Sequence, residues 1–172
     1  MSGSRIFGVT GWKNAGKTTL VERLVAEFVR RGWRVNTIKH GHHDLDIDQP
    51  GRDSYRHRAA GAAEVAVVGG RRYAIMREQA EAPLAEVLFR LAPADLVLIE
   101  GFKREPHRKI EVRAGTGEPM AAGDPNIVAI AADEQPAERH LPWFRRDDIA
   151  AIADFIALLA VKPGYRLPEK MP

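Results

Sequence analysis

The chain has 172 residues and a mass of 19.1 kDa, the size of one ordinary domain. Its composition, with 45% hydrophobic and 28% charged residues and no cysteine, excludes a largely disordered chain, a disulfide scaffold and a cysteine-based metal site. The net charge of +3 suits an anionic ligand but is too small to indicate a nucleic-acid-binding protein. We therefore interpret most of the dispersed arginines as solvated surface; these arginines are Arg30, Arg31, Arg34, Arg71, Arg72, Arg145 and Arg146.

Apolar stretches in the sequence are short. None approaches the roughly 20 apolar residues that a membrane-spanning helix needs. Residues 1–5 lead directly into an apolar strand and lack the long apolar segment of a signal peptide. We therefore expect a protein without a membrane segment that is located in the cytoplasm.

The first third of the chain predicts a strand, a helix and a second strand. The apolar run Ile6–Thr10 predicts a buried strand. Residues 17–31 carry apolar side chains at helical spacing and are followed by Gly32, so they predict a helix with a glycine stop. Residues 33–38 predict the second strand.

The middle third predicts a loop, a short helix and a hairpin. Residues 39–53 have no apolar period and predict a loop whose length is typical of functional segments. Residues 53–60 predict a short helix with Asp53 as its N-cap. Two strands, 64–68 and 72–76, predict a hairpin because they flank a glycine-glycine turn.

The last part of the chain predicts two further helices and three strands. Pro83 suits the first position of a helix. The run Leu96–Ile99 is the most apolar in the chain and predicts a strand that is covered on both faces. Strands are also predicted over 109–112 and 127–131, and a final helix, capped by Asp147 or Asp148, extends to residue 159.

Alternating strands and helices predict the fold class. The pattern indicates an α/β fold with a mostly parallel sheet that is flanked by helices. We expect a single nucleotide-binding domain over residues 1–160, followed by a loose C-terminal tail over residues 161–172, which contains three prolines.

The segment Gly11–Thr18 matches the phosphate-binding pattern G-x-x-x-x-G-K-[ST] at every fixed position, between a predicted strand and a predicted helix. Its glycines let backbone N–H groups form an anion-binding concavity at a helix N-terminus. Lys17 is expected to reach the β- and γ-phosphates, and Thr18 to bind Mg²⁺ through its hydroxyl. The motif predicts a P-loop NTPase fold. Its nucleotide-binding residues are Gly11, Trp12, Lys13, Asn14, Ala15, Gly16, Lys17, Thr18 and Thr19.

Lys13 is a second lysine within this loop. One subclass of nucleotide-binding proteins carries an extra lysine near this point that reaches phosphate across a dimer. In that pattern the extra lysine stands five residues before Lys17, at the position that Trp12 occupies here. We therefore interpret Lys13 as a solvated loop lysine.

Glu100 follows the apolar run Leu96–Ile99 directly and precedes Gly101. A P-loop site needs a carboxylate near the magnesium ion, usually at the end of a neighbouring strand. The carboxyl edge of a parallel sheet is also where ligands bind. Glu100 is therefore predicted to bind Mg²⁺ or its water shell, whereas Asp95 begins the same strand and is interpreted as a cap at the opposite end.

The segment 40–48 concentrates histidines and aspartates. In one interpretation it is a switch segment in which Asp46 or Asp48 contributes to the Mg²⁺ site or orients the attacking water. In a second, the imidazoles of His40, His42 and His43 bind a transition metal. In a third, it is a solvated polar loop. The sequence leaves these interpretations open.

Together, these motifs resemble the molybdopterin-guanine dinucleotide biosynthesis protein B (MobB) family. The resemblance extends from residue 6 to about residue 159. The segments that carry it are Gly11–Thr18, Ile38–His43, Asp46–Asp48, Pro50–Arg56, Gly61–Ala62 and Ile99–Lys103.

The resemblance implies a dimeric P-loop GTP-binding protein with weak GTPase activity. Such a protein is expected to act as an adapter to a MobA-type guanylyltransferase, the enzyme that attaches GMP to molybdopterin. The resemblance implies GTP and Mg²⁺ as ligands, with molybdopterin as a further one. Lys17, Asp46 and Glu100 would form the catalytic set, and Thr18, Asp46 and Glu100 would surround the metal.

Asp133 follows a predicted strand and is expected to accept hydrogen bonds from N1 and N2 of guanine. The usual guanine signature N-K-x-D is absent, because none of the three asparagines is followed by lysine. The preference for guanine therefore rests on the resemblance.

Two other functions remain open. A small-molecule kinase would use the same phosphate grip with an acceptor pocket and a basic lid, for which Arg104, His107 and Arg108 are candidates. A metal-delivery GTPase would use the three histidines of segment 40–48. For dimerisation, the predicted hairpin at Gly69-Gly70 is the candidate interface, because free backbone groups on an edge strand favour pairing.

Overall fold

The computed structural model describes residues 3–41, 48–79, 82–115 and 118–164. It divides into two compact units, one formed by Met1–His40 with Leu84–Pro172 and the other by Gly41–Pro83. The first unit holds a large sheet and the P-loop, and the second holds a hairpin and a short helix. The single domain predicted over residues 1–160 stays a prediction.

Within its described residues, the first unit consists of strands and helices in alternation. Its strands are β1 (Arg5–Thr10), β2 (Val35–Lys39), β5 (Leu96–Glu100), β6 (Lys109–Val112), β7 (Ile127–Ala131) and β8 (Trp143–Phe144). Its helices are α1 (Lys17–Arg30), α3 (Leu84–Arg90) and α4 (Ile149–Leu159). Every predicted element of this unit is confirmed, and β8 is an addition. In the part of the chain that the structure describes, no helix is long and apolar enough to cross a bilayer.

The six strands form one sheet in the order β2-β5-β1-β6-β7-β8, and every neighbouring pair is parallel. The predicted α/β fold with a parallel sheet is therefore confirmed. From β1 the chain moves to β2 on one side, and from β5 it crosses β1 to β6 on the other side. The winding thus reverses at β1, and ligands of such sheets bind at the carboxyl ends of the strands at this reversal. The P-loop follows β1 at that edge.

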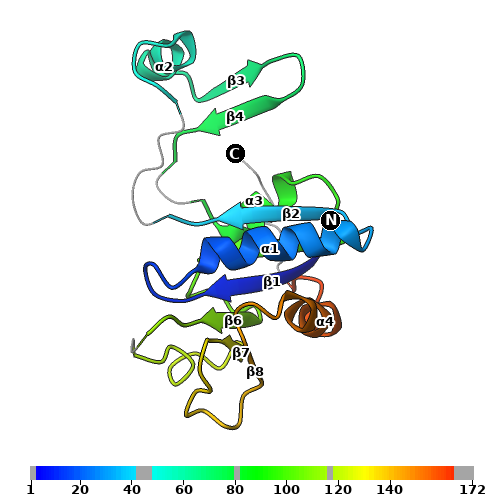
Figure 1. The fold of residues 1–172 in the computed structure, drawn as a ribbon. Helices are drawn as coiled ribbons and strands as arrows, with labels where there is room; N and C mark the ends of the chain where they lie inside the picture. The colour runs from blue at the N-terminus through cyan, green and yellow to red at the C-terminus, as the bar shows by residue number, and fades with distance from the viewer. Residues whose placement is uncertain (1–2, 42–47, 80–81, 116–117, 165–172) are drawn as a thin grey trace. The chain divides into compact units, whose positions relative to one another are not determined.

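Alternate side chains of the sheet enter two apolar cores. Helices α1 and α4 cover one face, over the strand residues Phe7, Val9, Leu96, Leu98, Ile110 and Ala129. Helix α3 covers part of the opposite face, over Ile6, Ile38, Val97 and Ile99. Figure 1 shows α1 running along the sheet beside β1 and β2. The first of these cores fixes α1, and so holds its N-terminus at the end of β1.

The part of the second face that lies over β6 is polar. Lys109 and Glu111 are both fully buried there. The Lys109 ammonium donates to Asp124 at 2.8 Å, and Glu111 accepts from the backbone N–H groups of Met120 and Ala121 at 2.9 and 3.0 Å. These bonds hold the segment after β6 against the sheet and satisfy two buried charges that would otherwise be costly.

The second unit contains α2 (Asp53–Ala59) and the antiparallel hairpin of β3 (Glu64–Val68) and β4 (Tyr73–Arg77). The predicted hairpin and short helix are confirmed. The predicted N-cap is wrong, because Arg52 is the cap residue and Asp53 begins the helix. The turn bond from the Arg52 N–H to the Gln49 carbonyl, at 3.1 Å, brings the chain to the helix one residue earlier than predicted.

The C-terminal segment begins with a bond to the sheet. The N–H of Ile6 donates to the carbonyl of Val161 at 2.9 Å. Val161 belongs to the predicted loose tail, and its position is therefore fixed by β1. Residues 165–172 lie outside the described residues.

Candidate nucleotide-binding site

The loop between β1 and α1 depends on left-handed backbone conformations. Gly11, Asn14 and Gly16 have φ values of +147°, +62° and +93°. Glycine adopts such values freely, and asparagine tolerates them better than most residues. A Cβ at Gly11 would lie 2.4 Å from the backbone oxygen of Val112, so only glycine fits. The loop therefore turns tightly and leads straight into the N-terminus of α1, where an anion is stabilised.

Lys17, the motif lysine, folds back over this loop. Its ammonium donates to the carbonyl of Trp12 at 2.7 Å. Burial lowers the pKa of Lys17, the carboxylate of Glu100 opposes that shift, and the positive charges of Lys103 and Lys39 add to it. The ammonium of Lys103 also lies 4.8 Å from the centre of the Trp12 ring. Three lysines therefore gather at the mouth of the loop, where a polyphosphate would neutralise their mutual repulsion.

Thr18 and Glu100 meet beside the loop. The Thr18 hydroxyl donates to a carboxylate oxygen of Glu100 at 2.9 Å. Glu100 is the last residue of β5 and only 8% exposed. The structure thus brings together two of the predicted metal-site residues, which lie 82 positions apart in the sequence.

Asp95 lies at the other end of the strand that carries Glu100. Its carboxylate accepts from the backbone N–H of Arg34 at 2.8 Å, just before β2 begins. This bond confirms its interpretation as a cap at the start of the strand and separates it from the phosphate loop.

The remaining loop residues differ in their surroundings. Trp12 is 48% exposed, and its indole N–H donates to the Glu118 carbonyl at 2.7 Å. Lys13 is exposed, in agreement with its interpretation as a solvated lysine. Ala15 is buried against the sheet, and Thr19 faces a cavity on the side of α1. The binding roles assigned to these residues stay predictions.

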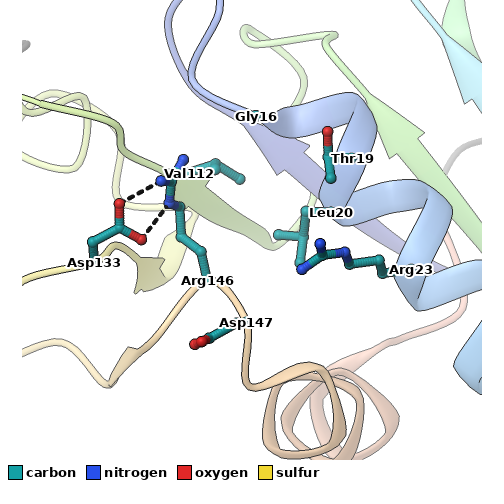
Figure 2. Close-up of a pocket in the computed structure, with 8 residues that line it drawn as sticks. All are labelled: Gly16, Thr19, Leu20, Arg23, Val112, Asp133, Arg146 and Asp147. Atoms are coloured by element: carbon teal, nitrogen blue, oxygen red, sulfur yellow. Dashed lines mark hydrogen bonds and ion pairs between the residues drawn. The ribbon is translucent and has the colours of Figure 1, made fainter.

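Beside the phosphate loop, a cavity opens between the start of α1 and the loops that follow β7 and β8 (Figure 2). Figure 2 shows Asp133 and Arg146 paired on one side of it and Arg23 of α1 pointing in from the other. The lining residues are Gly16, Thr19, Leu20, Arg23, Val112, Asp133, Arg146 and Asp147. The cavity therefore combines the predicted base-reading residue with the beginning of the motif helix.

Arg146 holds Asp133 with two parallel bonds. Its Nε donates to one carboxylate oxygen at 2.8 Å, and its Nη2 donates to the other. This pairing lowers the pKa of the Asp133 carboxyl below its usual range. The third nitrogen, Nη1, donates to the carbonyl of Ala15 in the phosphate loop at 3.2 Å.

Arg146 is an exception to the expectation that most of the dispersed arginines are solvated surface. Its side chain is 31% exposed, because the chain after β8 turns it toward Asp133 and the phosphate loop. No motif surrounds it in the sequence. The two-residue strand β8 carries its loop to this edge of the sheet and is too short to show a periodic pattern.

A second, largely apolar cavity lies between α1 and β2. It is lined by Thr18, Val21, Glu22, Val25, Thr37, Ile38, Lys39 and Glu100. Thr18 and Glu100 therefore border open space between α1 and β2. A small ion could reach the hydroxyl and carboxylate oxygens from this cavity.

Segment 40–48 is described only in part. Asp46, His42 and His43 lie outside the described residues. His40 stacks on Phe102, with ring centres 4.3 Å apart. Asp48, in the second unit, accepts from the Ser54 hydroxyl at 2.8 Å. Among the residues that the structure describes, no three His, Asp or Glu side chains are grouped as a metal site would require.

Two of the residues suggested for a kinase lid, His107 and Arg108, contact other elements of the first unit. His107 is 4% exposed, and a Cβ at Gly8 of β1 would lie 2.5 Å from its Nε2. Arg108 donates to the carbonyl of Leu159 at the end of α4, at 3.1 Å. Neither arrangement resembles a mobile lid.

Comparisons with known proteins identify the family and the fold. A family model described as molybdopterin guanine dinucleotide synthesis protein B matches residues 6–133. Two similar relatives are named molybdopterin-guanine dinucleotide biosynthesis adapter protein. The one from Haemophilus influenzae is 38% identical over 88% of this chain and 86% of its own length. The one from Escherichia coli is 36% identical over 88% of this chain and 90% of its own length. The crystal structure of Bacillus subtilis MobB superposes with a TM-score of 0.73 at 27% identity and covers 92% of this chain and 99% of that one.

Proposed function

This chain belongs to the MobB family of molybdopterin guanine dinucleotide synthesis proteins, and on that premise we propose an adapter in molybdopterin guanine dinucleotide biosynthesis that binds GTP with Mg²⁺ and hydrolyses it slowly. The adapter role is supported by the names of the Haemophilus influenzae and Escherichia coli relatives. Nucleotide binding is supported by the site itself. The observation that carries it is the meeting of Thr18 and Glu100 at the N-terminus of a P-loop helix.

The phosphates would lie in the loop over residues 11–16. Its left-handed residues bend the backbone into a concavity at the start of α1, where backbone N–H groups and the helix dipole favour negative charge. Lys17 is close enough to bond the Trp12 carbonyl. It would exchange that bond for one to the phosphate, because an ionic partner is the stronger acceptor.

The donor set at Thr18 and Glu100 fits Mg²⁺. A hydroxyl and a carboxylate are hard oxygen ligands, and the two are already 2.9 Å apart. Thr18 would hold the ion directly, and Glu100 would hold it or its water shell. Bound there, Mg²⁺ would neutralise charge on the phosphates.

Slow hydrolysis follows from an uneven division of roles. Lys17 would stabilise the charge that develops on the γ-phosphate while water attacks in line. We assign the orientation of that water to Asp46 or Asp48 of segment 40–48. A site that binds the triphosphate tightly but orients the attacking water poorly hydrolyses GTP slowly. The nucleotide then stays bound for a long time, which suits an adapter.

The base would enter the cavity beside α1. Asp133 lines that cavity and carries a carboxylate that can accept the N1 and N2 hydrogens of guanine. Guanine preference rests on this one side chain and on the family, because the sequence lacks the usual guanine signature.

The partners would be a MobA-type guanylyltransferase, molybdopterin and a second copy of this chain. The hairpin β3–β4 supports the self-association, because a two-stranded sheet is only marginally stable alone. Its exposed apolar residues are Val67, Val68, Tyr73 and Ile75. A mass of 19.1 kDa in light scattering would contradict the dimer and leave the nucleotide site untouched.

The test of the proposal is Lys17→Ala, with Lys162→Ala as the control. Lys162 is an exposed lysine near the C-terminus. Hydrogen bonds to charged groups contribute up to about 3 kcal/mol, so K17A should weaken GTP binding by about 100-fold in calorimetric titration with Mg²⁺. K162A should bind as the unaltered chain does. Equal affinity in K17A and the unaltered chain would contradict the proposal.

Product analysis separates hydrolysis from the kinase alternative. With GTP labelled at the γ-phosphate, slow release of free phosphate that K17A abolishes supports the GTPase. Transfer of the label to an added small molecule would instead identify a kinase.

A further inference from the structure

The bidentate pair of Arg146 and Asp133 is the feature of the cavity that the proposed function leaves unused. The pair joins two loops, and its two side chains are 31% and 60% exposed. Such a pair is too exposed to be needed for the stability of the fold. It nevertheless occupies both oxygens of the carboxylate that faces the cavity.

The guanidinium of arginine and the N1–C2–N2 edge of guanine present the same chemistry. Each is a planar group in which two parallel N–H bonds flank one carbon atom, and each therefore matches a carboxylate with two parallel hydrogen bonds. In the structure, Arg146 uses Nε and Nη2 for this purpose. Arg146 therefore occupies the edge of Asp133 that a guanine base requires.

Resting on the proposed function, we infer that Arg146 is an internal competitor of guanine: it pairs with Asp133 in place of the base, and only a base with the same pair of donors can exchange with it. Guanine offers N1–H and N2–H and replaces both bonds. Adenine has an acceptor at N1 and no amino group at C2, so it leaves the ion pair intact. The pair therefore lowers the affinity for guanine ligands and leaves the affinity for adenine ligands unchanged.

The remaining bond of Arg146 gives a competing explanation that can be separated from this one. Nη1 donates to the Ala15 carbonyl at 3.2 Å, and it lies 3.2 Å from the position of a Cβ at Gly16. If Arg146 served only to hold the phosphate loop, its removal would weaken every ligand with a triphosphate. If it competes with guanine, its removal should strengthen guanine ligands alone.

The experiment uses the full chain with Mg²⁺ and three ligands: GTP, ATP and inorganic tripolyphosphate. Arg146→Gln should raise the affinity for GTP by about 2- to 5-fold, the range that an exposed ion pair allows. Its affinities for ATP and tripolyphosphate should stay within twofold. Arg146→Lys, which keeps the charge but loses the two-pronged geometry, should raise the GTP affinity by a smaller factor.

Arg145→Gln is the matched control. It removes the same charge one residue away, where Arg145 pairs with Asp147 at 3.2 Å on the surface. It should leave all three affinities within twofold. Asp133→Asn should lower the GTP affinity by about tenfold and remove the effect of R146Q in the double variant, since the shared acceptor is then gone.

Unchanged or weakened GTP binding in R146Q would overturn the inference, and so would an equal gain for ATP. Failure of the proposed function gives a different result, because the unaltered chain would then bind neither GTP nor tripolyphosphate. Tripolyphosphate has no base, so its binding reports the phosphate loop alone.

Discussion

The two ends of the candidate site are built differently. The phosphate end, which comprises residues 11–18 and Glu100, takes its shape from the backbone. Gly11 packs against a carbonyl of β6, and Thr18 meets a buried carboxylate. The base end, which comprises Asp133 and Arg146, consists of two long side chains from separate loops.

The difference matters because the two ends can change independently. A concavity of N–H groups recognises any triphosphate, and it tolerates few substitutions where the loop has left-handed conformations, at Gly11, Asn14 and Gly16. An exposed ion pair can be altered without damage to the fold. Changes at the phosphate end should therefore affect all nucleotides alike, and changes at the base end should affect their ratio.

The largest effect is expected from Gly11→Ala at the phosphate end. The left-handed conformation costs an alanine about 1–2 kcal/mol. The contact at 2.4 Å from the Val112 carbonyl adds the cost of overpacking, typically about 1–3 kcal/mol. The free energy of unfolding, measured with urea, should fall by roughly 2–5 kcal/mol, and GTP and ATP binding should be lost together.

Gly32→Ala is the control for that variant. Gly32 has φ +85°, and no atom would lie within 4 Å of a Cβ added there, so it isolates the conformational cost of about 1–2 kcal/mol. Equal losses of stability in the two variants would mean that the contact with Val112 is unimportant and that the phosphate end is less constrained than the structure indicates.

Most of the phosphate end could be predicted because it is local. Eight consecutive residues form the loop, and their strand and helix have clear apolar patterns. Glu100 is distant in sequence, yet it ends the most apolar strand, and parallel strands place their carboxyl ends at one edge.

The base end could be predicted only in part. Asp133 follows a recognisable strand, but its partner Arg146 depends on β8, which has two residues and therefore no periodicity. Arg146 also stands beside Arg145 in a chain with 26 basic residues, so its charge gave no sign of a role. The partner of Asp133 follows from tertiary packing of two loops, which no short-range pattern records.

Acid should lower the free energy of unfolding through His107, which packs against β1 beneath the phosphate end. The ion pair at the base end should keep its charges over the same pH range. Burial, with the nearby charge of Lys109, lowers the pKa of His107 to about 4 from an ordinary 6.5. The unfolded chain therefore binds the proton more readily. The contribution of neutral His107 to the free energy of unfolding is therefore complete above pH 6.5. It should fall by roughly 3 kcal/mol in all as the pH drops toward 4. Asp133 stays charged through this range, because Arg146 lowers its pKa.

His107→Leu tests the acid effect. Among the described residues, neither ring nitrogen of His107 has a hydrogen-bond partner, so an apolar side chain should cost little at pH 7. Between pH 6.5 and 4, the unfolding free energy of H107L should fall less than that of the unaltered chain. Parallel pH profiles for the two proteins would show that His107 is not the group that titrates.

The smallest effect is expected from Glu100→Gln, which keeps an acceptor for Thr18 but removes the charge. The gain in affinity that Mg²⁺ provides should fall by about tenfold, as is typical when a metal site loses a supporting group. The factor should be the same for GTP and ATP. A change in their ratio would place Glu100 near the base and contradict the division between the two ends.

The same variant should also move the alkaline limit of binding. Lys17 must be protonated to attract phosphate, and the charge of Glu100 raises its pKa against the opposing effects of burial, Lys103 and Lys39. Without that charge the pKa of Lys17 falls further, so E100Q should lose affinity at a lower pH than the unaltered chain in a titration at constant Mg²⁺. An unchanged limit would mean that Glu100 acts on the metal alone, whereas a shift to lower pH would show that one carboxylate supports both the metal and the lysine.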